Sequence, residues 1–107
     1  MNSTVVQQVE KWYAEHAASL SEISTKLRMT SIQPRDAIKG SVAIEIETPE
    51  IIASAAFWNW NGDVSFITVN KRSREEKVDD RRLAPSDDIP SMLNDYFRKV
   101  TGLQSNG

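Results

Sequence analysis

Two segments of the chain, one near each end, carry apolar residues at the spacing of an amphipathic helix. In the first segment, residues three or four positions apart form the stripe Val5, Val9, Trp12, His16 and Leu20. Ser3 can cap the first turn, because its hydroxyl can accept a hydrogen bond from a free backbone N–H. This pattern predicts a helix over about residues 4–20.

The second segment begins with Ser86, Asp87 and Asp88, which are residue types that favour a helix N-terminus. Pro90 suits the first helical turn, and Gly102 is a suitable stop. The apolar face between them consists of Ile89, Met92, Leu93, Tyr96, Phe97 and Val100. We expect a helix over about residues 88–101.

Between these helices the hydrophobic period changes to two residues, as in a β-strand. In residues 22–30, Ile23, Leu27 and Met29 alternate with polar residues, and residues 41–48 alternate in the same way. Both segments are therefore predicted strands. Since Ile23 and Leu27 are also four residues apart, a first helix that continues to Met29 is an alternative.

Two turn signals predict antiparallel pairing of the strands that follow. Pro49-Glu50 precedes a strand over residues 51–60, and Asn61-Gly62 precedes a strand over residues 63–70. Asn-Gly favours a type I′ turn, because both central residues need a positive φ. The charged ribbon over residues 71–83 is either an edge ribbon that turns near Ser73 or a loose loop, and edge strands often carry such charge.

These elements predict a single α+β domain over residues 1–107. The simplest arrangement is an antiparallel sheet of about four strands, with the N-terminal and C-terminal helices packed on one face. A chain of this length can bury one core without disulfide bonds.

The two-residue turns also predict which side chains share a face of the sheet, because directly opposed residues do so. The turns pair Ile44 with Ala55, Phe57 with Phe66 and Trp58 with Ser65. The first two pairs belong to an apolar face, which should contact the helices, and the third pair belongs to the other face. The members of the apolar face are Val42, Ile44, Ile46, Ala53, Ala55, Phe57, Val64 and Phe66. The other face holds carboxylates at its middle and is therefore expected to contact water.

Two tryptophans fall on this second face. Large aromatic side chains among small and charged neighbours are typical of interface anchors. We therefore predict a partner-binding site formed by Trp58, Trp60, Glu45, Glu47 and Asp63. In the alternative, the tryptophans only cover the sheet or lie beneath the charged ribbon.

The composition disfavours several classes of protein, among them nucleic-acid-binding and membrane-spanning proteins. Thirteen basic and 15 acidic residues give a net charge of −2, so nothing predicts the basic surface of a nucleic-acid-binding protein. The sequence has no cysteine for a disulfide or a thiolate metal site. No apolar run approaches the ~20 residues of a membrane span, and the first residues lack a signal-peptide pattern. We expect a cytoplasmic protein that binds neither nucleic acid nor membrane.

No motif predicts catalysis, a cofactor or a metal ion. His16, the only histidine, lies on a helix stripe, and the chain has no Gly-x-Ser-x-Gly nucleophile. Glu45 and Glu47 could form a glycosidase-like pair, but nothing else indicates a sugar cleft. The Asp pairs at 79–80 and 87–88 lack a calcium-loop pattern, and the four glycines form no phosphate loop. We therefore predict a binding protein rather than an enzyme.

The segment IIASAAFWNWNGDVSFITVNKRSREE, together with Trp12, resembles the small bacterial immunity proteins of the TriTu family. The matching features are the strand end at Ala56 to Trp58, the turn at Gly62 and the alternating strand from Asp63 to Val69. The chain departs from that layout in an extra Asn-Trp before the turn and in its C-terminal helix. The resemblance implies a protein that neutralises a cognate toxin domain by direct binding and has no catalytic residues. The alternative is a homo-oligomeric adaptor or a secretion-chaperone-like domain, such as a homodimer.

Overall fold

The computed structural model describes residues 5–32, 40–58, 62–84 and 86–101. They form an α+β fold, as predicted, but its antiparallel sheet has five strands rather than about four. In chain order the elements are α1 (Val5–Ile23), β1 (Lys26–Ile32), β2 (Ser41–Glu47), β3 (Ile51–Trp58), β4 (Asp63–Asn70), β5 (Glu76–Arg82) and α2 (Ile89–Thr101).

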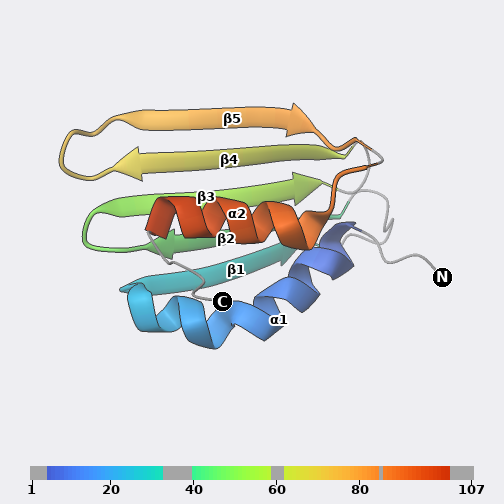
Figure 1. The fold of residues 1–107 in the computed structure, drawn as a ribbon, viewed down its shortest axis with the longest axis horizontal. Helices are drawn as coiled ribbons and strands as arrows, with labels where there is room; N and C mark the ends of the chain where they lie inside the picture. The colour runs from blue at the N-terminus through green and yellow to red at the C-terminus, as the bar shows by residue number, and fades with distance from the viewer. Residues whose placement is uncertain (1–4, 33–39, 59–61, 85, 102–107) are drawn as a thin grey trace.

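The five strands form a meander, in which each strand pairs with its neighbour in the sequence, in the order β1-β2-β3-β4-β5. Both helices lie on the same face of the sheet, as predicted (Figure 1). The helix α1 contacts β1, β2 and β3, while α2 contacts β3 and α1. The β4–β5 side of the sheet is therefore the side that the helices cover least.

The predicted register between β2 and β3 is confirmed. Ile44 opposes Ala55 and Val42 opposes Phe57 across the turn at Pro49-Glu50. Thr48 closes this turn, because its backbone N–H donates to the Ile51 carbonyl oxygen at 2.8 Å and its hydroxyl accepts from the Ile51 N–H at 3.1 Å. These bonds explain how a polar residue that is only 6% exposed can be buried at the turn.

The predicted register between β3 and β4 is wrong by two residues. Phe57 opposes Val64, and Ala55 opposes Phe66, whereas we expected Phe57 to oppose Phe66. The reason is the longer connection, since β3 ends at Trp58 and β4 begins at Asp63. A shift of two residues preserves the faces of the sheet. The rings of Phe57 and Phe66 still meet edge to face, with their centroids 6.1 Å apart.

The charged segment after β4 is a hairpin, as in the first of the two alternatives for it. The side-chain oxygen of Asn70 accepts hydrogen bonds from the backbone N–H groups of Arg72 and Ser73, at 2.9 and 3.0 Å. Arg74 takes a positive φ of 63°, and the Asn70 N–H donates to the Glu75 carbonyl oxygen at 2.8 Å. β5 then pairs with β4 as an edge strand whose residues are all exposed.

The boundary between the first helix and the first strand differs from the prediction. The helix continues to Ile23 rather than ending near residue 20, and the strand covers Lys26–Ile32 rather than residues 22–30. The Ser24 hydroxyl donates to the Leu20 carbonyl oxygen at 2.7 Å, which satisfies an acceptor at the helix end. The Thr25 N–H then donates to the Glu47 carbonyl oxygen at 2.7 Å and starts the sheet pairing. The alternative helix that continues to Met29 is wrong.

One hydrophobic core lies between the sheet and the two helices. It contains every residue that we predicted for the apolar face of the sheet, and its buried members are Val6, Val9, Trp12, Leu20, Val42, Ile44, Ile46, Ala53, Ala55, Phe57, Val64, Phe66, Ile89, Leu93 and Phe97. Trp12 joins the helices, because its indole N–H donates to the Asn94 side chain at 2.9 Å and its ring stacks on Phe97. The Tyr96 hydroxyl ties α2 to β4 by donating to the Ile67 carbonyl oxygen at 2.9 Å.

The position of Leu93 gives a test of this core. Leu93 is 0% exposed, and Leu93→Ala should lower the free energy of unfolding by about 3 kcal/mol, through lost burial and a residual cavity. The measurement is urea denaturation followed by circular dichroism. Lys99→Ala, an exposed position on the same helix, is the matched control and should change stability by less than about 0.5 kcal/mol. Equal effects of the two substitutions would contradict the packing of α2.

Candidate functional site

The candidate site is the face of the sheet opposite the helices, which we call the open face. Burial alternates along the three central strands, and their buried positions all point to the helix side. Both described helices pack on that other side, so neither covers the open face. The open face receives four residues from each strand, and the cross-strand register arranges them in four rows.

Trp58 lies on the open face, at the end of β3, and is half-buried. Its cross-strand neighbour on β2 is Ser41, and Asp63 begins the adjacent strand β4. The charged segment does not cover Trp58, because β5 extends the sheet beside β4. Trp60, the second predicted anchor, lies outside the described residues.

The three predicted carboxylates also lie on the open face, and each is paired with a cation. Arg28 contacts Glu45 at 3.1 Å, Lys71 contacts Glu47 at 2.6 Å, and Arg82 contacts Asp63 at 3.4 Å. The carboxylates were predicted as site residues, but the three cations were not. The cations come from β1, the β4–β5 turn and β5. The open face is therefore bordered by charges of both signs rather than by a negative rim.

The Lys71–Glu47 pair is the least exposed of these contacts, with about 30% of each side chain accessible. The hydrogen bond from the Lys71 ammonium lowers the pKa of Glu47 below its ordinary value of 4.5. Partial desolvation of the carboxyl group opposes this effect, and the charges of Lys71 and Lys26 add to it.

A second feature of the open face is an apolar patch, which was not predicted as part of a site although strand alternation places Ile52, Ile67 and Val69 on this face. Ile52 opposes Val69 across β3 and β4, and Ile67 opposes Val78 across β4 and β5. These four residues, which we call the apolar patch, are adjacent on the sheet, and Val78 is 54% exposed. Val78 lies beside the other three residues only because β5 pairs with β4. Its neighbours in the sequence are charged, so no apolar pattern indicates that it belongs to the patch.

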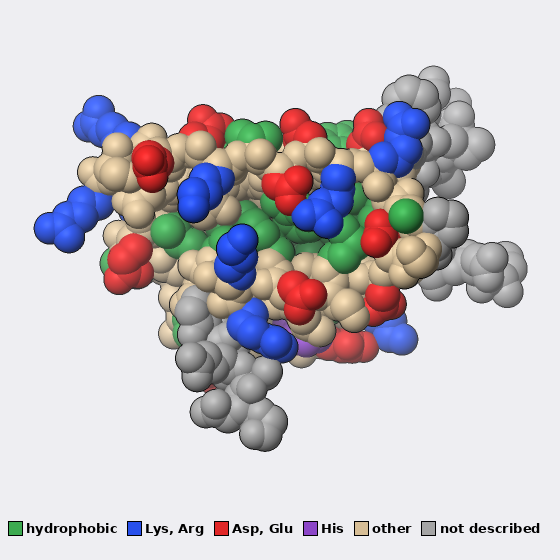
Figure 2. Space-filling view, turned by 45° about the horizontal axis from the view of Figure 1, so that its top comes forward, with side chains coloured by type: hydrophobic (Ala, Val, Ile, Leu, Met, Phe, Trp, Pro, Cys, Tyr) green, Lys and Arg blue, Asp and Glu red, His purple; other side chains and the backbone are tan. Residues whose placement is uncertain are grey.

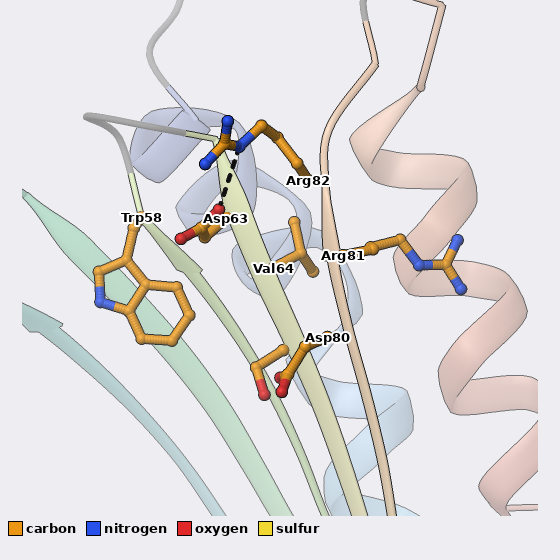
Figure 3. A pocket seen from close by; sticks show the side chains of 7 residues that line it. Trp58, Asp63, Val64, Asp80, Arg81 and Arg82 are labelled. Carbon is orange, nitrogen blue, oxygen red and sulfur yellow. Dashed lines mark hydrogen bonds and ion pairs between the residues drawn. The ribbon is translucent and has the colours of Figure 1, made fainter.

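A hollow of about 780 Å³ lies at one end of the open face, between Trp58 and β5. Its lining residues are Trp58, Asp63, Val64, Ser65, Asp80, Arg81 and Arg82. Figure 3 shows that the Arg82 guanidinium reaches Asp63, whereas the Arg81 side chain extends away toward α2. Asp80 opposes Ser65 in the register and projects over the same region.

The helix side of β4 and β5 has its own shallow groove, lined by Phe66, Asp79, Arg81, Met92, Asp95, Tyr96 and Lys99. The Arg81 guanidinium lies over the Phe66 ring, 5.7 Å from its centroid, and pairs with Asp79. Figure 2 shows hydrophobic side chains along this groove, with charged side chains of both signs on either side. Charged residues thus cover the part of the core that α2 does not reach.

The other candidate groups have structural roles. His16 Nδ1 donates to the Trp12 carbonyl oxygen at 2.8 Å, and its ring stacks on the Trp12 ring. Asp88 caps α2 by accepting from the Ser91 N–H and hydroxyl, at 3.1 and 2.6 Å. Within the described ranges, no three histidine, aspartate or glutamate side chains gather into a possible metal site.

Neither described helix is long and apolar enough to cross a membrane. The chain matches no protein-family model, no curated protein and no solved structure in comparisons with each. The resemblance to TriTu immunity proteins therefore stays a prediction.

The Lys71–Glu47 pair predicts a pH effect. In Lys71→Gln, the pKa of Glu47 should rise toward 4.5, because its main stabilising donor is lost. A lowered carboxyl pKa stabilises the fold above pH 4.5, and this contribution should disappear as the pH falls through the lowered pKa. Carboxyl-carbon NMR titration measures the pKa, and urea denaturation at several pH values measures the stability difference.

Arg28→Gln is the matched control for this experiment. It removes the cation that contacts Glu45 on the same strand, and it should leave the titration of Glu47 almost unchanged. If Glu47 titrates identically in the wild type and Lys71→Gln, the ion pair has no effect in solution.

Proposed function

We propose that this chain is a non-catalytic binding protein that holds a partner protein on the open face, and that it is an immunity protein that neutralises a bacterial toxin domain. The observation that carries the proposal is the uncovered sheet face on which half-buried Trp58 and the apolar patch occur together. A sheet with both helices on one side needs no aromatic residue on its other side for folding, so Trp58 is available for contacts with a partner.

The character of the open face suits a protein partner. Its apolar patch is bordered by ion pairs, which is the usual arrangement of a hydrophobic interface centre and a polar rim. Glu76 and Asp80 on β5 add negative charge to the same face, which disfavours a nucleic-acid backbone. A partner surface with exposed apolar and mixed charged side chains is favoured instead.

The lowered pKa of Glu47 favours a role in binding rather than in catalysis for this carboxylate. A general base works best when its pKa lies near the working pH, so catalytic carboxyl groups usually have a raised pKa. Glu47 shows the opposite direction, because Lys71 lowers its pKa. Glu45 is held by Arg28 in a similar contact, so this pair resembles interface charge more than reaction chemistry.

The immunity function rests on the resemblance of the β3–β4 hairpin region to the TriTu family. In that reading the cognate toxin domain docks on the open face, and binding blocks its active site or excludes its substrate. A small binding domain whose face is built on paired β-strands suits this task, because an ordered surface loses little conformational entropy on association.

A homodimer is the second candidate, and one feature of the register favours it. Lys26 on β1 and Glu76 on β5 lie at opposite ends of the same cross-strand row. If two open faces stack about a twofold axis parallel to the strands, β1 of each copy lies over β5 of the other. That arrangement brings each Lys26 near the Glu76 of the second copy and would make the interface self-complementary.

The Trp58 side chain is the main test of the proposed function. Trp58→Ala should weaken binding of the cognate toxin domain by more than about 2 kcal/mol, or roughly 30-fold in the dissociation constant. The stability of the fold should change little, because Trp58 lies outside the buried core. Isothermal titration calorimetry with a catalytically inactive toxin domain measures the affinity, and thermal denaturation measures the stability.

Tyr13→Ala is the matched control, because Tyr13 is another half-buried aromatic residue but belongs to α1. It should leave the affinity unchanged. Unchanged affinity in Trp58→Ala together with a much lower melting temperature would show that Trp58 serves the fold. No binding by the wild-type protein would reject this toxin domain as the partner.

Light scattering tests the homodimer. Under the proposed function, the protein alone should be a monomer at micromolar concentration, with the open face accessible. A stable dimer that dissociates in Lys26→Glu and reforms in the double variant Lys26→Glu/Glu76→Lys would support the second candidate instead.

A further inference from the structure

We propose that the hollow beside Trp58 is a pocket for an arginine side chain of the partner, which would make this corner the anchor of the interface. The inference rests on the proposed function, since it names the chemistry of the group that the open face receives. Three observations carry it: the shape of the hollow, the Asp80 carboxylate, which has no ion pair among the described residues, and the aromatic wall formed by Trp58.

The shape of the hollow follows from the sizes of the side chains on β3, β4 and β5. Ser65 occupies the centre of this corner, and its neighbours on β3 and β5 are Ala56 and Asp80. Because Ser65 and Ala56 are small, the surface is depressed between the Trp58 indole on one side and β5 on the other. The depression is open to solvent, and Trp58 and Asp80 both border it (Figure 3).

The charges around the hollow are distributed unevenly. Asp63 is paired with Arg82, and on the opposite face of β5 Asp79 is paired with Arg81. The Asp80 carboxylate, by contrast, has no hydrogen bond or ion pair with any residue that the structure describes. Within the described ranges, the hollow therefore presents one carboxylate that has no direct contact with a cation.

An arginine side chain suits this combination better than other groups. Its planar guanidinium can lie on the face of an indole ring and can also donate two parallel hydrogen bonds to one carboxylate. The ammonium group of lysine is more compact and more strongly hydrated, and it lacks this fork geometry. An anion is disfavoured because it would be repelled by the negative charge of the Asp80 carboxylate.

The experiment uses the isolated protein, labelled with nitrogen-15, and follows its NMR spectrum during titration with N-acetyl-arginine amide. We expect saturable shifts at the Trp58 indole N–H and at the backbone of Ser65 and Asp80, with a dissociation constant on the order of 30 mM. N-acetyl-citrulline amide, which has nearly the same shape but no charge, should bind at least about fivefold more weakly.

Two variants locate the pocket. Asp80→Asn should weaken the arginine probe about fivefold. Asp79→Asn is the matched control, since it removes the same charge from the adjacent position on the other face of β5, and it should leave the titration unchanged. Trp58→Leu should abolish saturation, because the aromatic wall is lost.

The outcomes separate this inference from the function on which it rests. Equal binding of the citrulline probe, equal effects of Asp79→Asn and Asp80→Asn, or equally tight binding of N-acetyl-lysine amide would each overturn the arginine pocket. None of these results would affect toxin binding by the open face, which calorimetry with Trp58→Ala tests separately. Conversely, a positive titration without any binding of the toxin domain would retain the pocket and reject that partner.

Discussion

The burial of one face of the sheet under two helices is the constraint from which the other features follow. Ile44, Ile46 and Phe57 are 0% exposed, and they lie with Ala53 and Ala55 on the part of the apolar face that belongs to β2 and β3. The two alanines are small enough to let the helices approach the sheet closely. Because side chains alternate strictly along a strand, every position between these residues must point to the other face. Because opposed residues on paired strands share a face, the same alternation holds on every strand of the meander.

Since both helices lie on one side, the residues that the structure describes supply no third layer for the other side. In an antiparallel sheet, the face that contacts water usually carries polar side chains. Here the edges of the open face follow that rule, because ion pairs such as Arg28–Glu45 hold charged side chains over the strands. The apolar patch and Trp58 depart from it. Exposed apolar clusters of this kind mark interaction sites more often than isolated exposed residues do, which is why the open face is the strongest candidate for function.

The sequence predicted the elements whose residues alternate or repeat with a clear period. Both helices, the β2–β3 turn at Pro49-Glu50 and all buried apolar positions of the sheet were predicted on that basis. The predicted β3–β4 register was wrong because the prediction assumed that Asn61-Gly62 is the whole connection between the two strands. The strand β5 was predicted only as one of two alternatives, since an edge strand buries nothing and Val78 is its single apolar residue. Hydrophobic patterns carry no information about such a strand.

The same limit explains what was missed in the candidate site. Glu45, Glu47 and Asp63 could be assigned to one face from alternation alone, but their cationic partners lie on other elements, and only the paired strands bring them together. Each of these carboxylates already contacts a cation of the chain, so a cationic group of a partner would share or replace that contact. Asp80 was not predicted, yet its carboxylate has no such contact within the described part of the chain. Under the proposed function, electrostatic specificity on this face depends more on Asp80 of β5 than on Glu45, Glu47 and Asp63.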